Sequence, residues 1–247
     1  MIPLKSEEDL KMLAEAGRIL SRIVKELGRS VRAGITTQEI DNLAKDLMSR
    51  EGVTSAFKGY RNFPAHICTS VNNEIVHGIP SDRRLEEGDI LGLDVGINYR
   101  DYFSDTAVTI PLGKINPRLK KLLQATRESL ALGIRKAQVK NHLFDISQAI
   151  QEYVESQGFS VVREFVGHGI GRNLHEEPEI PNFGRKNSGP LLLEGMVFAI
   201  EPMVNMGSWE AVIAENGWTA LTKDGLPSAH FEHTVAITKN GPQVLTQ

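Results

Sequence analysis

The sequence predicts an α+β fold in which one unit occurs twice along 247 residues. Two helical patterns followed by strand-like segments recur in residues 1–113 and 114–247. Gly52 and Gly158, which end the second helix of each half, are 106 residues apart. Residues 85–94 and 192–201 align at an offset of 107, share Leu, Glu and Gly, and each end in a carboxylate. Since no linker rich in Pro, Gly or Ser separates the halves, we expect one domain with a shared core.

Two helices are expected in the first half. Ser6 can cap the first, because its hydroxyl accepts from the free N–H groups and the acids at 7–9 suit the positive first turn. Thr36 begins the second, Glu39 completes a capping box, and the helix ends near Gly52. One apolar stripe follows the first helix at steps of three and four: Leu10, Leu13, Gly17, Leu20, Val24, Leu27 and Val31.

The second half repeats this plan. Asn116 caps a helix that has Pro117 at its first position, and a further helix ends near Gly158. The expected buried positions of this pair are Leu119, Leu122, Leu123, Thr126, Leu130, Ile134, Ile146, Ile150, Tyr153 and Val154. Strand-like runs cover residues 90–94, 103–110, 197–200 and 230–237.

Composition excludes several classes of protein. The chain has 28 Lys and Arg against 31 Asp and Glu, so no basic excess favours binding to nucleic acid or to an anionic membrane. No run of 18 apolar residues predicts a membrane span, and the N-terminus lacks the apolar region of a secretory signal. The single cysteine, Cys68, excludes an internal disulfide. We therefore expect a cytoplasmic protein.

Two acids follow apolar runs that should be buried. Asp94 comes after residues 90–93, and Glu201 comes after residues 197–200. An unpaired buried carboxylate costs several kcal/mol, and a metal cation is one remedy. The small residues Gly92 and Ala199 lie two positions before each acid, on the same strand face, and would leave room beside it.

A third acid, Asp105, belongs to the next strand-like run. A tight turn at residues 98–101 would place Asp94 directly opposite Asp105, about 5 Å apart at Cβ. Like charges in that position are destabilising unless a cation lies between them. Two acids in exposed loops are the alternative.

Glu232 is the fourth candidate acid. Alternation in residues 230–237 places it on one strand face with Thr234 and Ala236, although such a residue is often exposed to solvent. Three histidines join it as candidates. His168 lies in a glycine-rich loop at 167–171, whose glycines permit close backbone approach and leave the imidazole accessible. His175 follows His168 after seven residues, and His77 lies in the separate run of residues 76–80. A lone histidine is usually structural or exposed, which is the alternative for each.

The order Asp94, Asp105, His168, Glu201 and Glu232 resembles that of the methionine aminopeptidases, in their short, bacterial-like type I form. Residues 165–182 look like the signature of that family, and residues 198–203 and 228–234 look like its two glutamate motifs. The resemblance covers nearly the whole chain. It implies the pita-bread fold, with two pseudo-symmetric halves around a central metal site in a single catalytic domain of residues 1–247.

The resemblance also implies a ligand set for two divalent ions (Co, Mn, Fe, Zn or Ni). Asp105 and Glu232 would bridge the two ions. Asp94 would complete the protein ligands of one ion, and His168 and Glu201 would complete those of the other. Two such ions can lower the pKa of a shared water, and the resulting hydroxide would attack the first peptide bond. By the same resemblance His175 would stabilise the oxyanion, His77 would contact the scissile amide nitrogen, and Glu201 would shuttle the proton.

The implied substrate is the N-terminal methionine of nascent polypeptides and peptides with a small second residue. The resemblance implies a monomeric enzyme that in some cases acts at the ribosome. No nucleic acid and no membrane are expected as partners. Leu174 departs from the family pattern, where many relatives have Phe, so the pocket wall would be wider or softer. The residues that resemble the methionine pocket are Phe57, Tyr60, Phe63, Cys68, Leu174 and Trp218.

Two alternatives remain open. A proline-specific peptidase of the same fold would resemble this core but usually carries a separate N-terminal domain. A pita-bread module that has lost catalysis would bind peptides or proteins, and the loss of any ligand would favour it. All five expected ligands are present in the sequence.

Overall fold

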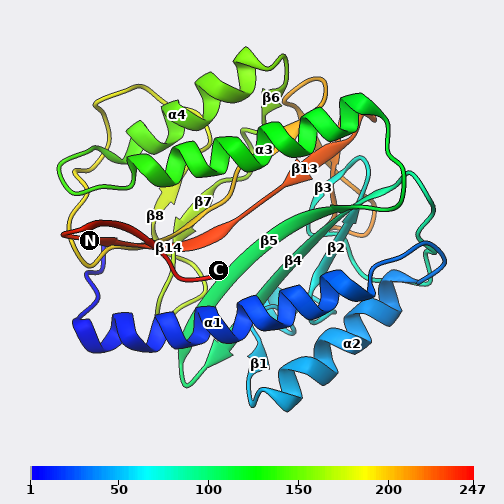
Figure 1. Ribbon diagram of the computed structural model, residues 1–247, viewed down its shortest axis with the longest axis horizontal. Helices are drawn as coiled ribbons and strands as arrows, with labels where there is room; N and C mark the ends of the chain where they lie inside the picture. Colours follow the sequence, from blue (N-terminus) through cyan, green and yellow to red (C-terminus); the bar gives the residue numbers. More distant parts are fainter. Residues whose placement is uncertain (1) are drawn as a thin grey trace.

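Paired helices flank a central β region in the computed structural model, which describes residues 2–247 (Figure 1). Helices α1 (Glu7–Ser30) and α2 (Thr37–Arg50) lie on one side, and α3 (Pro117–Lys136) and α4 (Leu143–Ser156) lie on the other. None of the helices within these residues is long and apolar enough to span a bilayer. The predicted α+β class is confirmed.

The expected helix starts are confirmed. Ser6 accepts from the N–H of Asp9 and the Asp9 carboxylate accepts in return, which completes a capping box, and Thr36 forms a second box with Glu39. The Asn116 side chain accepts from the N–H of Leu119 at 2.9 Å. Local sequence therefore determines where these helices begin.

The first half contains a four-stranded antiparallel sheet. Its central strand β4 (Ile90–Tyr99) pairs with β1 (Thr54–Ser55), β2 (Cys68–Val71) and β5 (Tyr102–Pro111). Buried side chains of α1 and α2, among them Leu20, Leu27 and Ile40, pack against Leu91 and Leu93 of this sheet. The sheet and its two helices thus share one apolar core.

The register predicted for the β4–β5 hairpin is wrong by two residues. Asp94 pairs with Ala107, and Asp105 pairs with Gly96, so the two acids are diagonal neighbours on the same strand face. The reason is the turn. Arg100 and Asp101 adopt left-handed conformations (φ 52° and 63°), which make a two-residue hairpin turn that matches the strand twist.

The second half contains a five-stranded sheet in the order β15-β14-β9-β7-β8. Two predicted elements differ from the structure here. The expected glycine-rich loop contains a strand, β7, and the expected strand at 230–237 is broken at Phe231 and Glu232 into β13 and β14. The bounds are β7 Gly167–Gly169, β8 Glu176–Ile180, β9 Val197–Ile200, β13 Ser228–His230, β14 His233–Thr238 and β15 Gly241–Val244.

Two smaller sheets complete the fold. One has the order β13-β10-β6, and the other, β11-β12-β3, pairs a strand of the first half with strands of the second. A short 3-10 turn, η1 (Tyr60–Asn62), precedes β2. The remaining bounds are β3 Glu74–Val76, β6 Ser160–Val161, β10 Met203–Asn205, β11 Ala211–Ile213 and β12 Ala220–Thr222.

Threonine hydroxyls connect the two halves. Thr234 Oγ1 accepts from the N–H of Asp105 at 3.1 Å and donates to its carbonyl at 2.8 Å. Thr106 Oγ1 donates to the carbonyl of Glu232 at 2.6 Å. The strands that carry the candidate acids are therefore fixed to one another.

Backbone conformation supports the internal repeat. Gly52 and Gly158 have φ 69° and 81°, and Gly88 and Gly195 have φ 97° and 89°. Each pair occupies the same place in its half, where only glycine adopts this conformation without strain. We propose on this basis that residues 1–113 and 114–247 are duplicated halves of one domain.

Candidate metal centre

Five side chains from both halves line one cavity of about 150 Å³. Asp94 and Asp105 come from the middle of β4 and β5, and His168 from β7. Glu201 directly follows β9, and Glu232 lies between β13 and β14. Ligand atoms of Asp105, His168 and Glu232 all lie within 4.8 Å of one another.

His168 is held by close strand packing. A Cβ at Gly167 would lie 2.4 Å from the carbonyl oxygen of Ala199, and one at Gly169 would lie 2.2 Å from that of Glu177. Only glycine permits this spacing. His168 Nδ1 lies 2.9 Å from the Gly169 carbonyl oxygen, so it carries the proton and donates. Nε2 is then free to bind a cation, 3.6 Å from Glu201 Oε1.

The prediction of an accessible His168 is wrong, since its exposed fraction is 7%. Glu232 is also buried, with an exposed fraction of 2%, so the solvent-facing alternative does not apply to it. The break between β13 and β14 accounts for this, because the N–H of Glu232 bonds to Ala107 of β5 at 2.9 Å. That bond holds Glu232 against the other half of the fold.

Burial dominates the electrostatics of the acids. It raises the pKa of Asp94 well above its usual range, with a further contribution from Asp105, and it raises the pKa of Asp105 to about 7. Burial followed by neighbouring carboxylates likewise raises the pKa values of Glu201 and Glu232. Burial lowers the pKa of His168 to about 3, so its imidazole is neutral.

The residues present fit divalent cations. Within residues 2–247, Asp94 Oδ1, Asp105 Oδ1 and Glu232 Oε1 are buried without a hydrogen-bond partner. Such orphaned carboxylate oxygens are costly unless a cation binds them. Carboxylate oxygens with one imidazole nitrogen suit Mn, Fe, Co, Ni or Zn.

His175 borders the metal centre. Its Nδ1 lies 2.9 Å from the Tyr60 hydroxyl, and its ring centroid lies 4.2 Å from that of His168. Desolvation, followed by the charge of Arg61, lowers the pKa of His175 to about 4. The imidazole is therefore neutral at pH 7 and can donate one hydrogen bond.

His77 is held at the cavity by its own chain segment. Its ring packs edge-on against Phe165 and Trp218, at centroid distances of 5.5 and 6.4 Å. Its carbonyl oxygen accepts from Thr219 Oγ1 at 3.3 Å. Burial lowers the pKa of His77 to about 4.

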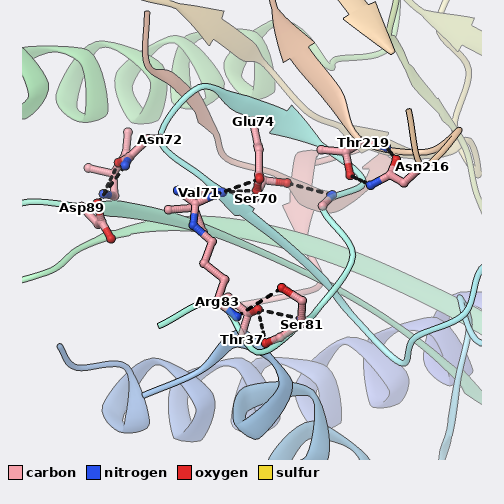
Figure 2. Close-up of polar contacts among 12 residues, drawn as sticks. Thr37, Ser70, Val71, Asn72, Glu74, Ser81, Arg83, Asp89, Asn216 and Thr219 are labelled. Atoms are coloured by element: carbon pink, nitrogen blue, oxygen red, sulfur yellow. Dashed lines mark hydrogen bonds and ion pairs between the residues drawn. The ribbon is translucent and has the colours of Figure 1, made fainter. Parts of the chain in front are cut away.

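Polar contacts fix the hairpin that precedes His77 (Figure 2). Asn72 donates to Asp89 at 2.8 Å, and Glu74 accepts from the N–H of Val71 at 2.7 Å. Glu74 also accepts from Arg83 at 2.9 Å. These bonds hold β2, β3 and the following loop, so His77 has a defined position although its own φ is 59°.

An apolar compartment adjoins the carboxylates. Phe63 contacts Phe57 and Trp218 edge-on, at centroid distances of 6.5 and 5.1 Å. A Cβ at Gly96 would lie 2.5 Å from Phe57 Cε1, so the absence of a side chain at Gly96 makes room for this ring. All six residues expected in the pocket line the same cavity as the acids: Phe57, Tyr60, Phe63, Cys68, Leu174 and Trp218.

Comparison with known proteins identifies the family. Residues 11–239 match the model of metallopeptidase family M24. The chain belongs to metallopeptidase family M24. A methionine aminopeptidase of Clostridium perfringens is 51% identical over 246 residues, which cover 100% of this chain and 99% of that protein. Methionine aminopeptidase 1 of Bacillus subtilis is 48% identical over 247 residues, 100% of both chains.

Solved structures with the same fold agree with this assignment. A methionine aminopeptidase from Thermotoga maritima has a TM-score of 0.98 and 42% identity, with both chains covered completely. The prolidase from Pyrococcus furiosus has a TM-score of 0.78 and 23% identity, covering 99% of this chain and 65% of that one, which shows the fold alone. The predicted pita-bread fold is confirmed, and membership of M24 implies divalent metal ions.

Sequence reasoning missed His230, Arg61 and Asn182 in this M24 chain. The buried His230 has Nε2 3.4 Å from Glu201 Oε2, and Asn182 Nδ2 donates to the Glu201 carbonyl at 3.0 Å. Strand alternation could have found His230, which lies two positions before Glu232. Exposed Arg61 also lines the cavity, and its position depends on an unusual turn (φ 46°) that the sequence does not signal.

Proposed function

We propose that this chain removes the N-terminal methionine from polypeptides and peptides whose second residue is small, by hydrolysis of the first peptide bond. The observation that carries the proposal is a single cavity lined both by carboxylates and an imidazole and by aromatic, aliphatic and sulfur-containing side chains. Relatives about 50% identical over the whole chain are named methionine aminopeptidases, which supports it.

The proposed ligands of two divalent ions are Asp94, Asp105, His168, Glu201 and Glu232. Asp105 and Glu232 are assigned as bridging ligands, Asp94 as a ligand of one ion, and His168 and Glu201 as ligands of the other. The ions (Co, Mn, Fe, Zn or Ni) would supply Lewis acidity and an activated water at neutral pH. The orphaned oxygens of Asp94, Asp105 and Glu232 support this assignment.

Three side chains are assigned to the reaction itself. Glu201 accepts the proton of the attacking water and delivers it to the leaving amine. The Tyr60 hydroxyl, 2.9 Å from Nδ1 of neutral His175, is assigned as the donor in that contact, so that Nε2–H would donate to the oxygen of the scissile carbonyl, where negative charge develops. His77 contacts the scissile amide nitrogen and is neutral because burial lowers its pKa.

The proposed specificity follows from shape. The methionine side chain enters the compartment of Phe57, Phe63, Cys68 and Trp218, where aromatic edges and a polarisable sulfur favour a thioether. The residue after methionine meets the segments that carry His77 and His175. Nascent polypeptides in the cytoplasm, in some cases at the ribosome, are the proposed substrates of a monomer.

A proline-specific peptidase is the competing function, because prolidases share the fold. The identity is 24% and 23% with two such structures but 42% with the Thermotoga maritima methionine aminopeptidase, which favours methionine removal. The metal-loaded protein should be assayed on Met-Ala-Ser and on Ala-Pro-Ser. Release of methionine without release of alanine supports the proposal. Release of alanine alone would select the competing function, and release of neither would select a binding module.

A further inference from the structure

We propose that a buried ion pair between Lys5 and Glu176 is a positioning element for His175. The ion pair fixes the loop that presents the imidazole to the scissile carbonyl. This inference rests on the function proposed above.

The ion pair closes the loop directly. Lys5 Nζ donates to Glu176 Oε2, and both side chains are only 7% exposed. The other oxygen, Glu176 Oε1, accepts the N–H of Asn173 at 3.1 Å. One carboxylate therefore joins both ends of the segment that contains Leu174 and His175. Glu176 is also the first residue of β8 and the next residue after His175.

The N-terminal segment reaches this carboxylate because two glycines leave space for it. The N–H of Lys5 donates to the Gly195 carbonyl at 2.7 Å, and a Cβ at Gly195 would lie 2.8 Å from the Lys5 carbonyl oxygen. A Cβ at Gly171 would lie 2.4 Å from Lys5 Cε and 3.0 Å from Glu176 Oε1. Gly167 and Gly169 serve the packing of β7, so Gly171 is the member of the glycine-rich motif that accommodates the ion pair.

Energetics favour a role in geometry. A buried ion pair loses hydration, and apolar residues of similar volume are often as stable or more stable. Its distinguishing property is that charged hydrogen bonds specify one arrangement of the groups they join. His175 needs such an arrangement, because its Nδ1 must stay near the Tyr60 hydroxyl and its ring beside His168. A misplacement of about 1 Å at a reacting centre can cost about 10²-fold in rate.

The test is a double-mutant cycle. The double variant Lys5→Met/Glu176→Gln removes both charges at nearly constant volume, which avoids leaving one buried ion without its partner. We expect kcat for Met-Ala-Ser to fall about 10- to 100-fold with KM nearly unchanged. In a His175→Ala background the same double substitution should lower kcat less than about twofold, because the group that it positions is gone.

A second variant should displace the ion pair sterically, without a change of charge. Gly171→Ala places a methyl group against Lys5 Cε and should reproduce the fall in kcat. The matched controls are Gly28→Ala, whose Cβ would make an ordinary contact of 3.5 Å with Ile110, and Arg22→Met/Glu51→Gln, which removes an ion pair outside the cavity. Neither control should change kcat.

A spectroscopic readout separates positioning from general damage. In the metal-free protein, the imidazole ¹⁵N resonances of His175 should shift in Lys5→Met/Glu176→Gln, because its bond to Tyr60 changes. Equal losses of kcat with and without His175, or an unchanged kcat in a folded double variant, would overturn the inference. An unchanged His175 resonance would do the same. Methionine release by the unmodified chain tests the proposed function separately.

Discussion

Without metal, the free energy of unfolding should fall as the pH rises from 7 to 8.5. Burial raises the pKa values of Asp94, Glu201 and Glu232 well above the usual range, so the folded chain keeps protons that the unfolded chain has lost. Groups with raised pKa values contribute stability that is fully present below about pH 4 and is lost as the pH rises through their folded values.

Five histidines with lowered pKa values act in the opposite direction but outside this pH window. Burial lowers their pKa values to about 3 or 4, so the stability that they contribute is present above about pH 6.5 and is lost as the pH falls. Above pH 7 they are neutral in both states. The acids therefore determine how the free energy of unfolding changes with pH above pH 7. The histidines concerned are His77, His168, His175, His230 and His233.

The expected magnitude follows from proton linkage. Each proton kept only by the folded state lowers stability by about 1.4 kcal/mol per pH unit, or about 2 kcal/mol over the window. For a chain of this size, about 2 kcal/mol corresponds to a decrease of about 4–8 °C in Tm. Excess divalent metal should abolish the decrease, because bound carboxylates are ionised throughout the window.

Thermal unfolding at pH 7.0 and 8.5, with chelator and with excess Mn²⁺, measures this effect. Glu232→Gln should lower by about one the number of protons that the metal-free protein releases on unfolding, so its free energy of unfolding should fall less steeply with pH. Glu51→Gln is the control, because its bond to Arg22 lowers the pKa of Glu51 and it is ionised in both states. A metal-free Tm that stays constant or rises over the window would refute the reasoning, since Asp94, Glu201 and Glu232 would then be ionised in the folded protein.

Three further outcomes concern activity. Glu232→Ala or Asp105→Ala should abolish turnover after metal loading, because each removes an assigned bridging ligand; a wild-type kcat in either variant would contradict the two-ion assignment. His175→Ala should lower kcat about 10²- to 10³-fold while metal binding by calorimetry is retained, and an empty metal site would instead make His175 a ligand. Met-Ala peptides should be cleaved far faster than Met-Lys peptides, with slow cleavage of Leu-Ala because Leu174 gives a softer wall. Comparable kcat/KM for Met-Lys would contradict the crowding at the second residue, and undetectable Leu-Ala cleavage would show that Leu174 does not widen the methionine pocket.

Local patterns predicted the helices well. Ser6, Thr36 and Asn116 cap helices where the sequence indicates, because capping depends on residues three positions apart. The hairpin register could not be predicted in the same way. The sequence indicated a turn at residues 98–101, whereas the observed turn needs Arg100 and Asp101 to adopt left-handed conformations for which Asn and Gly are the usual residues.

The error in register left the site prediction intact for a geometric reason. A shift of two residues preserves the strand face, so Asp94 and Asp105 still point into the same cavity, whereas a shift of one would have separated them. The residues that sequence reasoning missed depend on contacts between distant segments. Asn182 reaches the Glu201 carbonyl, and Lys5 reaches Glu176, across separations that no local pattern encodes.

The glycine-rich motif at residues 167–171 helps to position two histidines of the site, His168 and His175. Gly167 and Gly169 let β7 lie close to its neighbours and fix His168, whose Nε2 is then free to bind a cation. Gly171 leaves space for Lys5, which holds the carboxylate next to His175. The sequence alone predicted a glycine-rich loop with an accessible imidazole here. Neighbouring backbone and side-chain atoms occupy the space beside all three glycines, so their close packing gives both histidines defined positions.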